Sequence, residues 1–419
     1  MVVVMYFTPA VLLAEATAQA APIVDPRAPI SFQPTITQTS TGVAAVNIAA
    51  PNTNGLSANQ YSSFNVDSSG LVLNNSLVPG TPLLGGTLGA NPNLNGRAAT
   101  TILNQVTSTA PSTLAGPLEV FGSPASIIIS NPNGLSVNGL SLTNAPGLVL
   151  TTGTPQFITG PGGGLTSFAS AGAVAYNVAS GNITVNGPAG VNGPGAGVEG
   201  TVGNIDLIGQ SVTLNAPLHA NQTVNVITGN QTVIPGATGS SGTSYATSNI
   251  AAGTVGAIAV DASQYGSVTA GQIYIVSTVA GDGVNMQGPL AATAGNLSVN
   301  ANGDITVGQT FANQNVSLTS AGKVAISDTG LANQNYTVNA GRRQCDRQCL
   351  GGAGCCAYRR QQPECGDGGR ERAGQPCGRQ FDGAGLALRK RDQPADGNRR
   401  PDRQFGADRS RHHCGDRRT

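Results

Sequence analysis

The stretch LEVFGSPASIIISNPNGLSVNGLSLTNAPGLVL, residues 118–150, carries the pattern that decides the fold. It contains short apolar segments at 118–121, 127–129 and 148–150, and Gly, Asn and Pro separate them. Short apolar segments between turn residues are typical of β-strands, and no helical period fits this stretch. The sequence therefore predicts strands that are joined by tight turns.

The sharpest of these predicted turns is Asn131-Pro132-Asn133-Gly134. Pro132 fixes its own φ angle and keeps Asn131 extended, while Asn133 and Gly134 tolerate the left-handed φ that reverses the chain. A related segment, Asn91-Pro92-Asn93-Leu94, lies forty residues earlier. On turn chemistry alone, neither segment needs a role beyond reversing the chain.

Further motifs surround the two turns. LGG (84–86) precedes the first turn, AATTILNQVTS (98–108) follows it, and the upstream segment VNIAAPNTNGLSANQYSSFNVDSSGLVLNNS (46–76) contains GLS, FNV and GLVLNN. In this order the motifs resemble the secretion domain of the two-partner secretion exoproteins, the filamentous haemagglutinin-like family. The resemblance covers about residues 21–152. It implies a right-handed parallel β-helix with N-terminal capping strands and protruding hairpins.

The resemblance also implies a function for the two turns. In this family the NPNL and NPNG[IL] motifs are needed for recognition and export by a partner outer-membrane β-barrel transporter. Carried over to this chain, the secretion-motif residues are Asn91, Pro92, Asn93, Leu94, Asn131, Pro132, Asn133, Gly134 and Leu135. Such residues either contact the periplasmic domains of the transporter directly or stabilise the fold that the transporter recognises.

The amino-acid composition supports a repetitive β-architecture. Gly accounts for 58 of 419 residues, charged residues for 10% and aromatic residues for 4%, and Trp is absent. A globular core of ordinary composition would contain more large apolar side chains. Hydrophobic residues still make up 39% of the chain, which is too much for a disordered protein of high net charge.

A repeat appears in the second half of the body. Segments 211–230, 304–322 and 323–341 align on a shared Ala-Asn-Gln that begins at Ala220, Ala312 and Ala332, and the last two copies are twenty residues apart. A period near twenty residues, with two alternating strands in each unit, predicts a solenoid whose coils stack on a continuous core.

Stacking of equivalent positions would place Val, Ile and Leu inside the solenoid and would let turn asparagines bond in ladders. It also explains the scarcity of charge, because stacked coils bring like charges close together. We therefore expect an all-β parallel β-helix. At ~4.8 Å for each coil of about twenty residues, residues 31–340 would form a rod of about 70 Å.

The N-terminus has the features of an export signal. Residues 2–14 are an apolar run, and Ala18-Gln19-Ala20 is an A-x-A site that would be cleaved before Ala21. We expect residues 1–20 to be a signal peptide that the Sec machinery reads. No Lys or Arg precedes the apolar run. The exoproteins that this chain resembles often carry extended signal peptides, so the resemblance implies that Met1 lies inside a longer one.

Two domains are expected between the signal peptide and residue 341. Residues 21–270 are expected to form the secretion domain, and residues 271–340 the start of a haemagglutinin-type repeat β-helix. Glycine-rich loops at 160–165 and 186–200 are expected to protrude between strands such as 173–178 and 183–185.

The composition changes abruptly after residue 340. Up to that residue three basic residues stand against ten acidic ones, a formal charge of −7, whereas residues 341–419 carry +8 and all seven Cys. This tail contains no Val or Ile, so it cannot continue the solenoid. We expect it to be aberrant and disordered. A basic disordered tail that is genuine and a Cys-rich metal module are the alternatives.

We hypothesise that a frameshift produced the tail. Arg-Gln followed by Cys or Phe begins at residues 343, 347, 379 and 403. With the codons CGG and CAA, the loss of one base turns these triplets into Gly-Asn-Val and Gly-Asn-Leu, which is the pattern that the body uses at 181–183 and 295–297. A metal module is disfavoured because the tail has no C-x-x-C pair and no zinc-finger spacing of His and Cys.

Motifs for other chemistry are absent or out of context. A G-x-G-x-x-G at 195–200 leads into a predicted strand, whereas a dinucleotide site needs a helix there. His219 is the one histidine of the body, and no G-x-S-x-G accompanies it. Three cations in an acidic body do not suit nucleic acid. We therefore expect no catalytic, cofactor-binding or metal-binding residues.

The sequence thus predicts a non-enzymatic, secreted adhesin fragment that crosses the periplasm and reaches the bacterial surface, where its receptor is unknown. Two alternatives remain open. The chain could be the N-terminal part of a contact-dependent toxin or haemolysin, which uses the same N-terminal domain. It could also be an extracellular β-helix polysaccharide-active enzyme, which should expose a groove with clustered Asp, Arg or Lys.

Overall fold

The computed structural model describes residues 21–188, 195–200, 202–236, 244–250 and 257–341. These residues belong to one compact unit. The expected signal peptide with Ala18 and Ala20, and the expected frameshifted tail after residue 341, lie outside the described residues. In the described part, the helices are the single 3₁₀ turns η1 (Ile30–Phe32), η2 (Pro92–Leu94) and η3 (Phe168–Ser170), and none of them could span a membrane.

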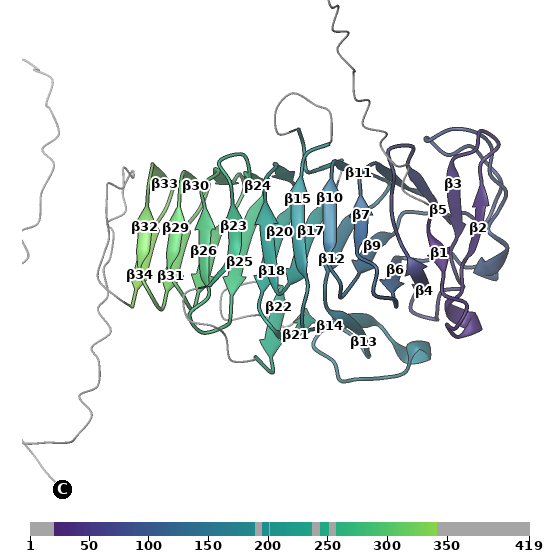
Figure 1. The fold of residues 1–419 in the computed structure, drawn as a ribbon, viewed down its shortest axis with the longest axis horizontal. Coiled ribbons are helices and arrows are strands. Elements are labelled where there is room, and N and C mark those ends of the chain that lie inside the picture. Colours follow the sequence, from purple (N-terminus) through teal and green to yellow (C-terminus); the bar gives the residue numbers. More distant parts are fainter. Residues whose placement is uncertain (1–20, 189–194, 201, 237–243, 251–256, 342–419) are drawn as a thin grey trace, which may run out of the picture. The chain divides into compact units, whose positions relative to one another are not determined.

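Three long sheets form the body of the structure (Figure 1). Sheet 1 contains, in spatial order, β1 (Ile23–Val24), β4 (Leu56–Ser63), β6 (Thr101–Val106), β9 (Ser126–Ser130), β12 (Gly147–Thr151), β17 (Asn204–Gly209), β20 (Thr223–Thr228), β25 (Gln272–Ser277), β28 (Leu297–Ala301), β31 (Val316–Ser320) and β34 (Tyr336–Ala340).

Sheet 2 is shorter and contains β7 (Ser112–Leu114), β10 (Leu135–Asn138), β15 (Asn182–Asn186), β18 (Ser211–Leu214), β23 (Ile258–Ala262), β26 (Gly283–Met286), β29 (Ile305–Val307) and β32 (Val324–Ile326). Sheet 3 contains β2 (Thr35–Gln38), β3 (Ala44–Asn47), β5 (Leu71–Asn75), β8 (Pro117–Gly122), β11 (Leu140–Thr143), β16 (Val198–Gly200), β19 (Leu218–His219), β24 (Val268–Ala270), β27 (Leu290–Ala292), β30 (Thr310–Ala312) and β33 (Gly330–Ala332).

From β7 onward the chain visits sheet 2, sheet 3 and sheet 1 in that order, once in each coil. Successive coils pair in parallel and in register. Ala312 pairs with Ala332, and Val316 pairs with Tyr336, so the predicted twenty-residue repeat is the distance from one coil to the next. The expected parallel β-helix is therefore confirmed.

One column of aliphatic side chains shows why the coils stack. At a single register position of sheet 1, seven successive strands place a buried side chain inside the solenoid: Ile127, Leu148, Ile205, Val224, Ile273, Leu297 and Val316. Burial of one such side chain is worth about 1.5–3 kcal/mol. A single coil has nothing to bury them against, so the stack folds as a unit.

The expected asparagine ladders are present at the corners. Asn335 donates from Nδ2 to Oδ1 of Asn315 over 2.9 Å, and Asn315 donates in the same way to Asn296 over 2.9 Å. An amide both donates and accepts, so it can repeat at every coil without the repulsion that stacked charges would cause.

Antiparallel strands cap the first coils, as expected. β1 pairs with β4, and β2 pairs with β3, both antiparallel. The stack is shorter than the predicted 70 Å, because ten spacings of ~4.8 Å between the eleven strands of sheet 1 make about 48 Å. The difference arises because two insertions, residues 152–181 and 229–257, leave the coils, and because the connection between β4 and β6, residues 64–100, makes one early coil much longer than twenty residues.

These two insertions build a side sheet of β13 (Thr154–Ile158), β14 (Ala173–Val178), β21 (Gln231–Pro235) and β22 (Tyr245–Ser248). All its pairs are antiparallel, and Tyr176 of the first insertion pairs with Val233 of the second. The side sheet lies along one side of the solenoid (Figure 1) and buries apolar side chains that sheet 1 turns outward, including Leu56, Leu103 and Ile128.

Candidate functional site

The second predicted turn, Asn131 to Gly134, closes through the side chain of its first residue. Asn131 Oδ1 accepts the backbone N–H of Asn133 at 3.0 Å, and the N–H of Gly134 donates to the Asn131 carbonyl at 3.1 Å. Gly134 has φ of 111°, whereas Asn133 is not left-handed. Of the two residues that the sequence marks as tolerant of a left-handed φ, only Gly134 adopts it.

The amide nitrogens of this turn bind the preceding coil. Asn131 Nδ2 donates to the carbonyl of Ala110 and to Oγ of Ser112, both at 2.9 Å, and Asn133 Nδ2 donates to the carbonyl of Ser108 at 2.7 Å. Leu135 then begins β10 as a buried residue that pairs with Ser112. The turn thus fastens the start of one coil to the segment around β7.

The first predicted turn has the same construction. Asn91 caps η2, and its side chain accepts the N–H of Asn93 at 2.9 Å. Asn91 Nδ2 donates to the carbonyls of Ile48 and Asn74 at 3.0 and 2.8 Å, and Asn93 Nδ2 donates to the carbonyl of Asn47 at 3.1 Å. Leu94 is buried. Here the left-handed residues follow the motif, at Asn95 and Gly96.

The two turns share one plan. In each, the first asparagine is buried and its amide nitrogen satisfies two acceptors on neighbouring segments, while the second asparagine reaches one further carbonyl. Asn131 is 0% exposed and Asn91 is 4% exposed. Pro92 and Asn133 are exposed and Pro132 is half-buried. Most polar atoms of both motifs are therefore engaged inside the fold.

The NPN pattern occurs twice in the sequence, and the structure contains a third turn of this kind. Asn52-Thr53-Asn54-Gly55 also reverses the chain, with Gly55 at φ of 84°. The pattern N-x-N-G-L-S, which Asn52 to Ser57 shares with Asn131 to Ser136, is the signal that could have revealed it. The NPN pattern does not include this turn, because Thr53 occupies the proline position.

The residues considered for catalysis, dinucleotide binding or metal binding lie outside the asparagine turns. His219 is exposed on β19, and the glycine motif at 195–200 runs into β16 with no helix after it. Within the described ranges no three His, Cys, Asp or Glu side chains cluster in a way that could hold a metal ion.

A hollow of about 710 Å³ lies beside β26 and β29, and the expected polysaccharide-active alternative can be compared with it. Asp304 is the single ionisable residue among the residues that line this hollow. A glycoside hydrolase needs two carboxyl groups that face the same bond. This hollow therefore lacks the pair that the enzyme alternative requires.

Three carboxyl groups have perturbed pKa values, and burial raises that of Asp282. Burial raises the pKa of Asp206 to about 6, although hydrogen bonds from Asn225 and Tyr245 act in the opposite direction. Hydrogen bonds from the Thr107 hydroxyl and the Arg27 backbone lower the pKa of Asp25 to about 2. All three groups lie outside the two NPN turns.

Comparison with known protein families identifies the domain. The model of the TPS secretion domain matches residues 20–307. The chain is similar to filamentous haemagglutinin of Bordetella pertussis (36% identity over 298 residues, 70% of this chain), to tRNA nuclease CdiA-2 of Burkholderia pseudomallei (38% over 276 residues, 65%) and to haemolysin of Serratia marcescens (35% over 282 residues, 67%). These alignments span 8%, 8% and 16% of the relatives' own lengths.

A solved structure agrees with these relatives. The crystal structure of the filamentous haemagglutinin secretion domain superimposes with a TM-score of 0.59 at 30% identity, over 80% of this chain and 100% of that one. Its match confirms the resemblance that the two asparagine turns and their flanking motifs indicate. The chain therefore belongs to the TPS secretion domain family, the secretion domains of the two-partner secretion exoproteins.

Proposed function

We propose that this domain directs export of the chain through a partner outer-membrane β-barrel transporter, and that the chain is the N-terminal part of a secreted, filamentous haemagglutinin-like adhesin. The role is non-enzymatic. The exported chain leaves the periplasm and reaches the cell surface. Residues 21–270 serve as the secretion domain, and residues 271–340 begin the repeat β-helix that carries adhesion.

The observation that carries this proposal is the shared construction of the turns at Asn91 and Asn131. Side chains that are 4% and 0% exposed are out of reach of a partner that meets the folded domain. We therefore infer that the two asparagines act through the fold, by fastening each coil to the one before it. A direct contact would have to use the exposed Pro92 and Asn133.

Folding of the repeat coils outside the cell, from residue 271 onward, offers a driving force for export. Each coil that emerges can add its aliphatic side chains to the column inside the solenoid, as Leu297 and Val316 do in neighbouring coils. Buried apolar surface is worth ~25 cal/mol per Å². Stepwise stacking on the transporter's outer side would thus oppose backward movement of the chain.

A contact-dependent toxin or haemolysin is the second candidate for the full-length protein. The similarity to a tRNA nuclease and to a haemolysin supports it, because both share this domain with filamentous haemagglutinin. The aligned part is 8–16% of these relatives, so the remainder decides the activity. Sequencing the gene downstream of the codon for residue 341, in all three frames, discriminates between adhesin repeats and a toxin domain.

The export role is tested in cells that co-express a two-partner transporter which exports the wild-type chain. Asn131→Ile removes the amide and inserts a branched apolar side chain at a fully buried position, so we expect the variant to accumulate in the periplasm. Asn133→Ala is the matched control, because it removes the solvent-exposed bond to the Ser108 carbonyl and leaves the bonds of Asn131 to Ala110 and Ser112 in place. Normal release of Asn131→Ile into the medium would refute the proposal.

A further inference from the structure

The third turn, residues 52–57, reproduces the hydrogen bonds of the NPNG turn. Asn52 Oδ1 accepts the N–H groups of Asn54 and Leu56, both at 3.0 Å, and the N–H of Gly55 donates to the Asn52 carbonyl at 3.0 Å. Asn52 is 8% exposed, and Leu56 begins β4 as a buried residue. We call this segment the Asn52 turn.

The Asn52 turn differs from the other two in what it fastens. Asn52 Nδ2 donates to the carbonyls of Phe168 at 2.7 Å and Ala171 at 2.8 Å, and Asn54 Nδ2 donates to the Ala171 carbonyl at 3.0 Å. These acceptors belong to residues 159–172, the hairpin tip between β13 and β14. The turn therefore joins segments that are more than a hundred residues apart, and it does not join two adjacent coils.

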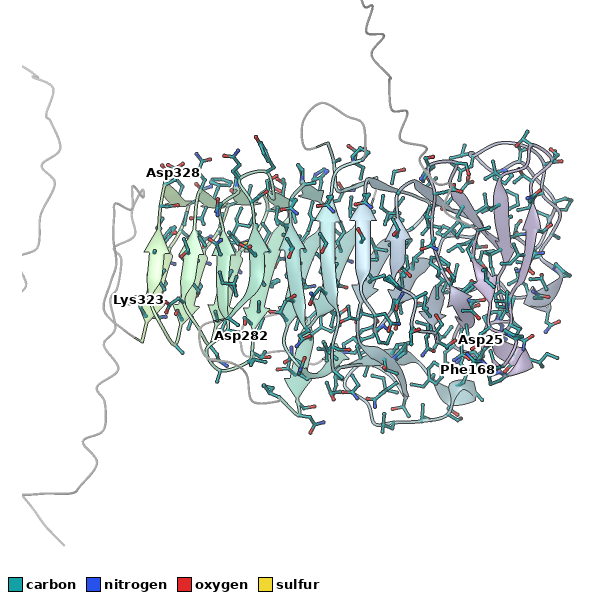
Figure 2. All side chains as sticks on the ribbon, viewed as in Figure 1. Asp25, Phe168, Asp282, Lys323 and Asp328 are labelled. Atoms are coloured by element: carbon teal, nitrogen blue, oxygen red, sulfur yellow. The ribbon has the colours of Figure 1, made fainter. Side chains whose placement is uncertain are left out.

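An apolar contact accompanies these bonds. The ring of Phe168 packs edge-on against Phe32 of η1 with centroids 4.9 Å apart, and against Phe157 of β13 at 5.4 Å. Figure 2 shows Phe168 at the same end of the solenoid as Asp25, close to where the described chain begins. The hairpin tip thus rests on the N-terminal cap, the strands β1 to β4.

The Asn52 turn is also tied to the first NPN turn. Arg97, which follows that turn, donates from Nη1 to the carbonyl of Thr53 at 2.7 Å. The N–H of Thr100 donates to the carbonyl of Gly55 at 2.9 Å. A Cβ atom at Gly55 would lie 2.5 Å from Oγ1 of Thr100, so this position is closed to side chains.

Release of the hairpin tip would expose apolar surface. The side sheet covers outward-facing side chains of sheet 1, among them Leu56, Leu103 and Ile128, and it contributes Val174 and Tyr176 to the same cluster. Exposed apolar patches of this kind promote association with other surfaces. The polar anchor that holds the tip closed therefore matters for a chain that must stay free in the periplasm.

We propose that Asn52 is a third export determinant, a positioning residue that fastens the hairpin tip to the N-terminal cap and so keeps the side sheet closed over sheet 1. This inference rests on the export function proposed above. It assigns a role to a position outside the NPN motifs, and it names a joint between the cap and the side sheet as the structure that export requires.

The test separates the turn from the fastening. Asn52→Asp keeps an oxygen that can accept the N–H groups of Asn54 and Leu56, but it replaces the donor that faces the carbonyls of Phe168 and Ala171. The matched control is Asn144→Asp, because Asn144 Nδ2 also donates to two carbonyls, at 2.8 and 3.0 Å, and both belong to the neighbouring coil.

Two measurements are made on the full chain. Export is the amount of chain in the medium relative to the periplasm of cells that co-express the transporter. Closure of the hairpin tip is the amide hydrogen exchange of residues 168–172 in the purified chain. We expect Asn52→Asp to accumulate in the periplasm and to exchange about tenfold or more faster at the tip, with the strands β17 and β20 protected as in wild type. Asn144→Asp should be exported and keep the tip protected.

Three results would overturn the inference. The first is normal export of Asn52→Asp while Asn131→Ile is retained, which leaves the proposed export function standing; release of both variants would instead refute that function. The second is retention of Asn52→Asp with unchanged exchange at the tip, or with exchange raised equally in β17 and β20. The third is equal retention of Asn144→Asp, since the loss of any two such bonds would then block export.

Discussion

Asp206 provides the sharpest prediction about stability, because its carboxyl group is buried where the side sheet covers sheet 1. Asn225 Nδ2 donates to Oδ1 at 2.6 Å, and the hydroxyl of Tyr245 donates to Oδ2 at 2.8 Å. Tyr176 is the other titratable group beside it. Burial raises the pKa values of both tyrosines, so both are neutral between pH 4 and 8. Among the residues that the structure describes, no Lys, Arg or His forms an ion pair with Asp206.

The magnitude follows from the pKa. One pKa unit is worth about 1.4 kcal/mol, so the rise from 3.8 to about 6 corresponds to roughly 3 kcal/mol. The folded protein binds this proton more tightly than the unfolded chain does. The contribution of protonated Asp206 to the free energy of unfolding is therefore complete below pH 3.8 and is lost as the pH rises through 6.

We expect wild type to lose unfolding free energy between pH 4 and 7, and Asp206→Asn to lose about 3 kcal/mol less over that interval. Asn225 Oδ1 has no hydrogen-bond partner among the described residues, and rotation of its amide would present that oxygen to the amide introduced by the substitution. Urea midpoints of the full chain at half-unit pH steps measure the difference. If the free energy of unfolding fell by the same amount with pH in wild type and in Asp206→Asn, the reasoning would be refuted.

Further predictions concern single joints of the fold. Gly181→Ala should cost about 2 kcal/mol or more, because φ is 88° and the new Cβ would lie 2.6 Å from the carbonyl oxygen of Pro132; a urea midpoint within error of wild type would contradict it. Asp25→Asn should lower the free energy of unfolding at pH 7 and should weaken its dependence on pH below pH 4. The reason is that the lowered pKa of Asp25 stabilises the fold at pH values above the pKa of the unfolded chain, and this gain is lost as the pH falls toward 2. An unchanged pH dependence below pH 4 in unfolding curves would count against it. Asn313→Cys with Asn333→Cys should form a disulfide, since the two positions follow the register pair Ala312 and Ala332 and lie one above the other in adjacent coils; peptide mapping that finds no such bond would count against this prediction.

The sequence predicts the coils well because their period is local. The apolar segments at 118–121, 127–129 and 148–150 coincide with β8, β9 and β12. Alternation of apolar and polar residues sets which side chains enter the solenoid, and a repeat of about twenty residues sets which strands pair. Both properties can be read from neighbouring residues, so the fold class and the register of Ala312 with Ala332 follow.

The side sheet could not be predicted in the same way. β14 and β21 pair through Tyr176 and Val233, yet their insertions are separated by two complete coils and share no period. Their pairing depends on the solenoid that brings them together. The predicted length was too great for a related reason, because the insertions and the long connection between β4 and β6 were counted as coils of twenty residues.

The asparagine turns could be located from sequence, but their partners could not. Turn chemistry predicts that Asn91 and Asn131 reverse the chain. Which carbonyls their amides reach is set by the coil below, and that information is not local. Asn52 shows the limit most clearly, since its acceptors at Phe168 and Ala171 lie in an insertion far along the chain.

The central claim is that the buried asparagines act through the fold, and one paired measurement tests it most directly. Export and amide hydrogen exchange are followed in the full chain for Asn131→Ala and Asn133→Ala. The account predicts that Asn131→Ala loses export together with the protection of β7 and β10, while Asn133→Ala keeps both. Loss of export in Asn131→Ala with unchanged protection of those strands would contradict the account and would indicate direct recognition of the side chain.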